Sequence, residues 1–344
     1  MSALRWGLIG ASDIAATRLI PAMRRLGQAP LAVLSSSAGR ADAFAHTHGI
    51  PRAYTDLEQL LDQGDIDAVY ISTTNELHLS QTLAAADAGK HVLCEKPLAL
   101  SVSDAWAMVD ACDGAGVVLA TNHHLPGAGT HRRVAQLVRD GAIGRPLAVR
   151  VFHAVELPER LRGWRLSDAS RGGGVILDIT CHDAAALRAI LEREAVEATA
   201  IAVRQGPWDA AVDDAVMSVI RFEDDVLVQT HDAFTIAHAA TGLQVHGSDG
   251  SIVATDVMSQ DPIGEVVVHR HGHEQVVESI DRSDLYDTAL SAFAGAVDGA
   301  RRPLVDGIDG ARAMAIALAV KEAADTGRAV RIESQPRTAS PTDW

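Results

Sequence analysis

Lys96, Asp178 and His182 are the side chains whose types and spacing best suit acid–base chemistry. Lys96 lies in the stretch His91–Pro97, which is predicted to start as a buried strand and to end in the charged pair Glu95 and Lys96. Pro97 fixes its own φ and ends the strand. Asp178 and His182 are four residues apart, so on a helix they share one face. A carboxylate beside an imidazole orients the ring and raises its pKa, which suits proton transfer near neutral pH.

A turn after the first predicted strand has the pattern of a dinucleotide-binding loop. It fits G-x-G-x-x-A, with Ser12 in place of the second glycine. Such a turn brings backbone N–H groups and a helix N-terminus to a pyrophosphate. The alternative is an ordinary tight turn in which Ser12 or Asp13 caps the helix. The residues predicted to contact the cofactor here are Gly10, Ala11, Ser12, Asp13 and Ile14.

The end of the second predicted strand, Leu31–Leu34, indicates which nicotinamide cofactor is bound. An NAD site carries an acid here that binds the ribose 2′-hydroxyl. This chain has Ser35, Ser36 and Arg40 instead, and no carboxylate before Asp42. Hydroxyls and a guanidinium suit a 2′-phosphate, so we predict NADP(H). The alternative is a serine-rich loop whose Arg40 is a solvated helix residue.

A nicotinamide site beside Lys96 predicts the reduction of a carbonyl group. Hydride transfer to a carbonyl makes an alkoxide that must gain a proton. We predict that His182 donates this proton and that Lys96 polarises the oxygen. The alternative is that Asp178 and His182 are a structural pair that caps the helix or packs in the core. The presence of Lys96 and a nucleotide site argues against this alternative.

The order of predicted elements indicates two domains. In the first third, helices separate apolar strands at Arg5–Ile9, Leu31–Leu34, Ala68–Ile71, His91–Glu95 and Val117–Thr121, which predicts a parallel, doubly wound α/β sheet. Later strands are predicted at Ala148–His153, Ala198–Val203, Ala215–Phe222, Val226–Asp232, Leu243–His246, Ser251–Ala254 and Val266–His269. We expect an NADP-binding Rossmann domain (1–122), a substrate-binding α+β domain with an open, mostly antiparallel sheet (123–333), and a flexible tail (334–344).

Composition excludes several classes of partner. The chain has 344 residues, 47% of them hydrophobic, a formal net charge of −15 and a pI near 5.4, which argues against nucleic acid and anionic membranes. No apolar run reaches the ~18 residues of a membrane span, and no secretory pattern opens the chain. Three cysteines without CxxC spacing indicate neither disulfides nor a zinc site. We predict a cytoplasmic protein.

The whole chain resembles the Gfo/Idh/MocA oxidoreductases, in which a Rossmann domain precedes an open-sheet domain. In that family a Glu-Lys-Pro segment and an Asp…His pair form the active site, which assigns these roles to Lys96, Asp178 and His182 and places Pro97 near the nicotinamide. Within the family the resemblance is to members that reduce 1,5-anhydro-D-fructose with NADPH. It extends over Trp6–Ala15, Ser72–His78, His91–Leu98, Thr121–Leu125, Val151–Pro158, Gly163–Leu166, Gly172–Asp183 and His231–Thr235.

The resemblance also implies further site residues. The cofactor or substrate site would include Ser12, Ser35, Ser36, Arg40, Thr73, Thr74, Asn75, His78, Glu95, Lys96, Pro97, Asn122, Trp164, Arg165 and Tyr286. Substrate contacts would come from Lys96, His153, Trp164, Arg165, Asp178 and His182, with no metal. For Thr73 and Thr74, a helix-capping role is the alternative.

The implied reaction is the reduction of a keto sugar, 1,5-anhydro-D-fructose, to 1,5-anhydro-D-mannitol. One alternative is another sugar or polyol dehydrogenase of the inositol type. The absence of an NAD-type acid after the second predicted strand argues against it. A second is a non-catalytic NADP-binding sensor, against which the presence of Lys96, Asp178 and His182 stands. We expect a monomer or a homo-oligomer formed through the C-terminal sheet.

Overall fold

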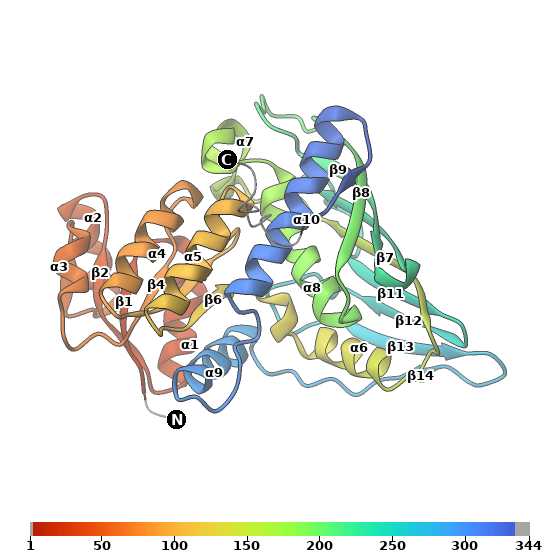
Figure 1. Ribbon diagram of the computed structural model, residues 1–344, viewed down its shortest axis with the longest axis horizontal. Coiled ribbons are helices and arrows are strands. Elements are labelled where there is room, and N and C mark those ends of the chain that lie inside the picture. The colour runs from red at the N-terminus through yellow and green to blue at the C-terminus, as the bar shows by residue number, and fades with distance from the viewer. Residues whose placement is uncertain (1–2, 334–344) are drawn as a thin grey trace, which may run out of the picture.

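The computed structural model describes residues 3–333, which form two sheets with helices between them (Figure 1). The first sheet is parallel, with strand order β3-β2-β1-β4-β5-β6, and the second is mixed, with order β14-β13-β12-β11-β7-β10-β9-β8-β15. The predicted combination of a Rossmann-like sheet and a mostly antiparallel second sheet is confirmed. The tail predicted at 334–344 lies outside the described residues.

Six short, largely buried strands make the first sheet: β1 (Arg5–Ile9), β2 (Ala29–Leu34), β3 (Arg52–Tyr54), β4 (Ala68–Ile71), β5 (His91–Glu95) and β6 (Leu119–Asn122). Parallel strands need crossover connections between them. In the first sheet these connections contain the helical elements η1 (Ala15–Leu19), α1 (Ile20–Arg25), α2 (Ala38–His48), α3 (Leu57–Leu61), η2 (Asn75–Leu77), α4 (His78–Asp87) and α5 (Val102–Gly114). The strand order reverses between β1 and β4, which opens a crevice at their carboxyl ends.

The second sheet contains β7 (Pro146–Ala154), β8 (Ala195–Val203), β9 (Ala215–Phe222), β10 (Leu227–Ala233), β11 (Gly242–Gly247), β12 (Gly250–Thr255), β13 (Glu265–Arg270), β14 (Val276–Val277) and β15 (Val330–Arg331). Only β7 and β10 pair in parallel among these strands. Their register sets Asp232 beside His153. The short η7 (Glu223–Asp225) joins β9 to β10 as a hairpin.

One face of the second sheet is covered by helices (Figure 1). The remaining helical elements are η3 (Leu125–Gly127), α6 (Gly129–Arg139), η4 (Glu159–Leu161), α7 (Gly163–Ser167), η5 (Ala169–Arg171), η6 (Ile176–Thr180), α8 (Cys181–Leu191), α9 (Leu285–Val297) and α10 (Gly307–Thr326). α10 packs against α5 and β6 of the first domain and also against α8 and β8. A Cβ on Gly310 of α10 would lie 2.0 Å from Thr121 Oγ1, so this contact requires glycine.

The helix α9 returns to the first sheet although it follows the second in sequence. Its Phe293 and Leu290 share a hydrophobic core with Trp6, and the Trp6 and Phe293 ring centroids are 5.3 Å apart. The division predicted at residues 122 and 123 therefore does not separate all packing, because α9 buries its apolar side against β1 and its neighbours. The boundary itself stays a prediction.

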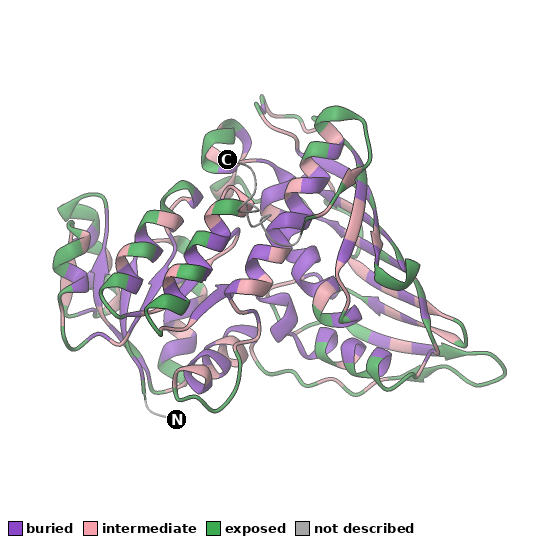
Figure 2. Ribbon diagram, viewed as in Figure 1, coloured by how far each residue is buried: buried purple, intermediate pink, exposed green. Residues whose placement is uncertain are grey.

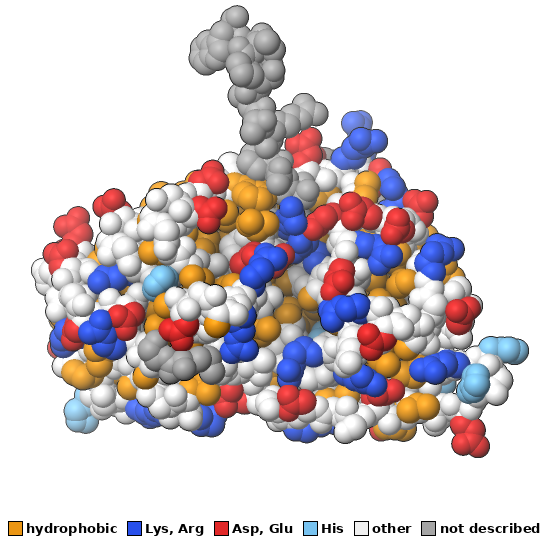
Figure 3. Space-filling view, turned by 60° about the horizontal axis from the view of Figure 1, so that its bottom comes forward, with side chains coloured by type: hydrophobic (Ala, Val, Ile, Leu, Met, Phe, Trp, Pro, Cys, Tyr) orange, Lys and Arg blue, Asp and Glu red, His pale blue; other side chains and the backbone are white. Residues whose placement is uncertain are grey.

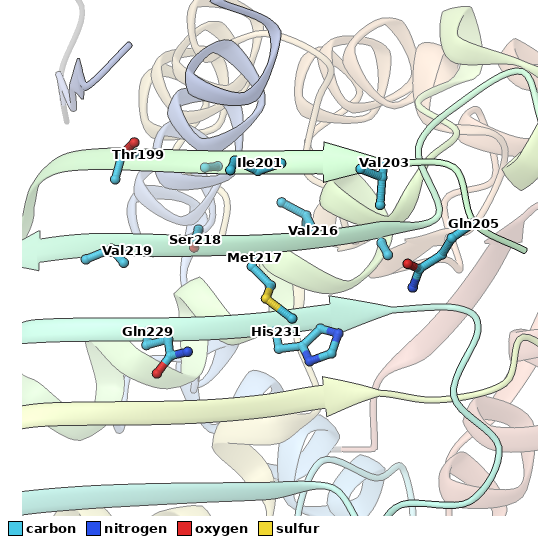
Figure 4. A pocket seen from close by; sticks show the side chains of 12 residues that line it. Thr199, Ile201, Val203, Gln205, Val216, Met217, Ser218, Val219, Gln229 and His231 are labelled. Carbon is cyan, nitrogen blue, oxygen red and sulfur yellow. The ribbon is translucent and has the colours of Figure 1, made fainter. Parts of the chain in front are cut away.

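The other face of the second sheet is open. Figure 2 shows helices with buried inner and exposed outer sides, whereas this sheet face has no covering layer. Ile201 and Met217 are 74% and 52% exposed, and they line a shallow cavity of about 380 Å³ with Gln229 and His231 (Figure 4). The face is thus partly apolar.

The surface carries mixed charge. Figure 3 shows acidic and basic side chains interspersed over one face of the molecule. Between residues 3 and 333, no helix combines the length and the apolar character that crossing a membrane requires.

Candidate active site

A cavity of about 1140 Å³ lies at the carboxyl edge of the first sheet. The loop after β1 and the loop after β4 form one side of it, at the point where the strand order reverses. Residues from η4, α7, η6 and α8 form the other side, so both halves of the chain contribute. This is where open α/β sheets bind ligands.

Asp178 holds Lys96 in the lining of this cavity. The peptide bond between Lys96 and Pro97 is cis. The Lys96 ammonium donates to the main-chain oxygen and to Oδ1 of Asp178, both at 2.7 Å, and Arg165 Nε lies 3.4 Å from the same Oδ1. Burial disfavours the charge on Asp178, but Lys96 and Arg165 outweigh it and lower the pKa of Asp178 to about 2. Asp178 is therefore an ionised carboxylate.

His182 does not have the environment that its spacing from Asp178 predicts. Asp178 lies in η6, a π-helical segment that ends before α8, and its carboxylate turns to Lys96. Within residues 3–333 the side chains of Asp178 and His182 form no hydrogen bond with each other. Burial, followed by the positive charge of Lys96, holds the pKa of His182 well below its ordinary value, so the predicted upward shift is wrong.

The partners of His182 are other histidines. Its Nδ1 lies 3.3 Å from Nδ1 of His123, and its ring meets that of His124 at a centroid distance of 4.4 Å and an angle of 65°. Two adjacent ring nitrogens form a hydrogen bond only when one of them carries the proton. His182 is thus a neutral imidazole that lines the cavity.

The turn after β1 has the close packing that a phosphate-binding loop needs. Gly10 has φ 118°, and a Cβ there would lie 2.9 Å from the Ser72 backbone. Ser12 Oγ accepts from the Ala15 N–H at 3.2 Å and donates to Ser72 Oγ at 2.8 Å. Ser12 therefore caps the helix, as the alternative interpretation had it, and still lines the cavity. These residues fit the backbone approach of a dinucleotide.

The far end of the cavity is lined by residues that follow β2 and β3. They are Leu34, Ser35, Ser36, Arg40 and Thr55. None is acidic, and the Arg40 guanidinium lies 3.4 Å from the Ala11 carbonyl oxygen. Three hydroxyls and one cation are compatible with a phosphorylated ribose.

Most of the predicted site residues line this one cavity. They are Gly10, Ala11, Ser12, Asp13, Ile14, Ser35, Ser36, Arg40, Thr73, Thr74, Asn75, Glu95, Lys96, Trp164, Arg165, Asp178, His182 and Tyr286. Their functional roles stay predictions, but the fold brings them together from loops, helices and a strand end in both halves of the chain.

Four predicted residues lie outside the lining: His78, Pro97, Asn122 and His153. The His78 ring contacts the carbonyl oxygens of Pro97 and Thr73, at 3.0 and 3.3 Å, so it supports the backbone around the Lys96 corner. His153 is bound to Asp183.

Asn122 acts on the cavity through Glu95. Its Nδ2 donates to Glu95 Oε1 at 2.6 Å, and the Tyr70 hydroxyl donates to the same atom at 2.5 Å. These bonds hold Glu95, whose pKa is raised mainly by burial, beside Lys96 at the end of β5.

Several lining residues were not predicted: Thr17, Arg18, Leu34, Thr55, Ser72, Glu76, Leu77, Gln81, Arg160, Leu161, Arg171 and Gln260. His124 also lines the cavity. Ser72, Glu76 and Leu77 lie in a segment that the resemblance included, so their positions could have been used. The arginines Arg18, Arg160 and Arg171 come from separate elements, and no local pattern marks them.

Comparisons with known proteins match both halves of the chain. Residues 4–123 match the oxidoreductase family with an NAD-binding Rossmann fold, GFO_IDH_MocA, and residues 131–253 match the GFO/IDH/MocA C-terminal domain. The chain is 50% identical over 331 residues to 1,5-anhydro-D-fructose reductase from Ensifer adhaerens, covering 96% of this chain and 99% of the relative. It is 31% identical over 332 residues to D-xylose 1-dehydrogenase (NADP(+)) 2 from Haloferax volcanii, covering 96% and 100%.

A solved structure has the same arrangement of sheets. Aldose-aldose oxidoreductase from Caulobacter crescentus, crystallised in complex with glycerol, matches with a TM-score of 0.87 and 26% identity. The match covers 96% of this chain and 100% of that one. Both sides of the cavity are therefore included in the similarity.

Proposed function

The chain belongs to the GFO/IDH/MocA oxidoreductase family, which confirms the resemblance seen in its sequence, and from this we propose a specific reaction. We propose that it reduces a keto sugar with NADPH, converting 1,5-anhydro-D-fructose to 1,5-anhydro-D-mannitol. The supporting observation is that the Lys96–Asp178 pair and the glycine turn line one cavity. The choice of sugar rests on the 50% identical reductase.

In this proposal Lys96 binds the substrate carbonyl oxygen and protonates it. Bound NADPH supplies the hydride for the carbonyl carbon. An ammonium group has three N–H donors, and Asp178 occupies two of them, so the third can donate to the carbonyl oxygen. As negative charge develops there, Lys96 stabilises it and transfers a proton, which completes the alcohol.

His182 contributes a second hydrogen bond in the proposed site. Because it is neutral, it cannot act as the cationic acid that its sequence spacing predicts. If His123 donates to His182 Nδ1, His182 carries its proton on Nε2 and can donate it to the same substrate oxygen. Asp178 then positions Lys96 rather than the imidazole.

NADP(H) is the cofactor that the cavity favours. The β2 end offers Ser35, Ser36 and Arg40 where an NAD site has a carboxylate. The 31% identical relative is named for NADP(+). The ratio of kcat/KM for NADPH and NADH tests this assignment, and a preference for NADH would contradict it.

A single assay separates the candidate functions. The protein is incubated with NADPH and a panel of keto sugars, and the absorbance of the reduced nicotinamide is followed. Fastest turnover of 1,5-anhydro-D-fructose supports the proposal. Oxidation of inositol or another polyol with NADP(+), without reduction of that sugar, would favour the dehydrogenase alternative. Cofactor binding without turnover of any of them would favour a sensor.

Assembly and location are further parts of the proposal. The open sheet face provides an apolar row, in which Met217 lies beside Ile201 and His231 in the strand register. Light scattering distinguishes the two predicted states: a mass of two or more chains that Met217→Glu reduces to one indicates association through this face, and a monomer mass excludes it. The cytoplasmic location stays a prediction.

A further inference from the structure

A buried polar cluster lies behind His182, between α8 and the second sheet. It consists of Thr180, Asp183, His153 and Asp232, and all four residues are buried. Thr180 and Asp183 stand on either side of His182 in sequence, at the junction of η6 and α8. His153 and Asp232 are register partners on the parallel strands β7 and β10. None of the four lines the cavity.

Each carboxyl group in the cluster has one oxygen with a clear partner. Thr180 Oγ1 donates to Asp232 Oδ2 at 2.5 Å, and His153 Nδ1 lies 2.6 Å from Asp183 Oδ1. The remaining oxygens, Asp183 Oδ2 and Asp232 Oδ1, are buried without a partner. The geometry makes the two carboxyl groups neighbours, because Asp183 bonds His153, the register partner of Asp232, and Asp232 bonds Thr180, three residues before Asp183. Each carboxyl group also affects the pKa of the other. Two ionised carboxylates in this position would repel each other, whereas one proton between them would satisfy both oxygens.

Within residues 3–333 no lysine or arginine is bonded to either carboxyl group, whose charged or titratable bonding partner is His153 on β7. Cys181 on α8 lies close enough for Asp183 to affect its pKa, and Lys96 affects the pKa of both His153 and Cys181. Burial lowers the pKa of His153 to about 4 and raises that of Cys181 to about 12, so both are neutral at pH 7. Burial likewise raises the pKa of Asp183 to about 8. Within residues 3–333 no three His, Cys, Asp or Glu side chains are arranged to hold a metal ion.

We propose that Asp183 and Asp232 share one proton, and that this bond positions the start of α8 and thereby His182. Asp232 then holds α8 at two points, through the Thr180 hydroxyl before His182 and through the Asp183 carboxyl after it. The change from π-helical η6 to α8 occurs between these points, so the strand supports the helix where its winding changes. Asp183 and Asp232 are positioning residues. The part that concerns His182 rests on the proposed function.

The shared proton is tested without substrate. A carboxyl whose pKa is higher in the folded protein than in the unfolded chain loses its stabilising effect as pH rises from about 4 to about 8. In Asp232→Asn the amide can donate to Asp183 and does not titrate. We expect the melting temperature of wild type to fall, relative to that of Asp232→Asn, across this range. We also expect the infrared band of a protonated carboxyl group at neutral pH to weaken in the variant. Parallel melting profiles and an unchanged band would overturn the shared proton.

The positioning role is tested by kinetics. Asp232→Ala removes both bonds, and we expect kcat to fall about 10- to 100-fold, with the NADPH dissociation constant unchanged and with rescue in Asp232→Asn. Thr230→Val, which removes a buried hydroxyl that bonds Ser218 on the neighbouring strand, is the matched control and should leave kcat unchanged. Wild-type kcat in Asp232→Ala would overturn the role.

Two outcomes of these tests require a replacement variant or a separate conclusion. If Asp232→Ala does not fold, Thr180→Val replaces it: a fall in kcat of about fivefold supports the positioning role, and no fall overturns it. If no keto sugar is turned over but the melting profiles diverge, the proposed function fails and the shared proton stands.

Discussion

The ammonium nitrogen of Lys96 lies 2.7 Å from Oδ1 of Asp178, although 82 residues separate the two in sequence. Lys96 ends a strand of the first sheet, and Asp178 belongs to a π-helical segment that lies against the second. The two side chains are only 15% and 17% exposed, so water screens the pair weakly. The contact therefore joins the two halves of the chain in the lining of the cavity.

Removing Lys96 should abolish most turnover and leave cofactor binding intact. We expect Lys96→Ala to lower kcat about 100- to 1000-fold, because both the proton donor and the charge that stabilises the oxyanion are lost. The NADPH dissociation constant, measured by fluorescence, should change little. Lys321→Ala removes an exposed lysine that pairs with Asp325 and serves as the control. Wild-type turnover in Lys96→Ala would remove this residue from the mechanism.

The pH profile of reduction should report a neutral His182. Because burial and Lys96 hold its pKa well below the ordinary value, we expect no His182 ionisation in kcat/KM between about pH 6 and pH 8. His182→Gln retains an N–H donor and should keep more activity than His182→Ala. A decline of kcat/KM above about pH 6.5 that is absent in His182→Gln would show that the cationic form acts instead.

Cofactor choice should depend on Arg40. We expect Arg40→Ala to reduce kcat/KM for NADPH about 10- to 100-fold, because a charge-assisted bond to the 2′-phosphate is lost, and to leave NADH kinetics nearly unchanged. Arg24→Ala, in α1, is a matched control, since within residues 3–333 the Arg24 side chain hydrogen-bonds only to the His48 carbonyl oxygen. An equal loss with both cofactors would show that Arg40 is structural.

Buried histidines should make the protein sensitive to acid. Burial lowers the pKa of His123 and His131 to about 3 and that of His153 to about 4. The unfolded chain binds protons below about pH 6.5 while these folded side chains do not, so stability falls as pH decreases. Each histidine contributes up to about 1.4 kcal/mol per pH unit. Urea unfolding at several pH values measures the slope, which His131→Gln should reduce. An unchanged slope would mean that His131 is charged in the folded state.

The contact of α10 with β6 should tolerate no added methyl group. We expect Gly310→Ala to lower the free energy of unfolding by about 1–3 kcal/mol, because its Cβ would overlap Thr121. Gly39→Ala, in a helix where a new Cβ meets nothing within 4 Å, should be neutral or stabilising. Denaturant unfolding measures the free energy of unfolding of both variants, and equal values would contradict the packing argument.

Strands with a strong local pattern were predicted from sequence to the residue. Arg5–Ile9, Ala68–Ile71 and Ala215–Phe222 are the bounds of β1, β4 and β9. The first two are buried runs and the third alternates, so local hydrophobicity specifies them. β3 and β14 were missed, because strands of three and two residues have no period to detect and form only beside a neighbour.

The candidate site was predictable in its members but not in all its contacts. The strand end at Lys96 and the glycine turn are local features, and the fold brings them to one cavity. The predicted pairing of Asp178 with His182 assumed that both residues lie on one α-helix. Asp178 instead lies in the π-helical segment η6, and its carboxylate points to Lys96. The Asp183–Asp232 cluster depends on the parallel register of β7 and β10, which no single stretch of sequence specifies.

The helix α10 limits how freely the halves of this protein could be exchanged with those of relatives. It contacts α5 and β6 on one side and α8 and β8 on the other, so its side chains are fitted to two partners at once. A chimera that joins the first 122 residues to a relative's second half would place a foreign α10 against Thr121. Such a hybrid folds well only if that helix also carries glycine at the position of Gly310. In evolutionary terms, the two sheets are then expected to change together rather than as independent modules.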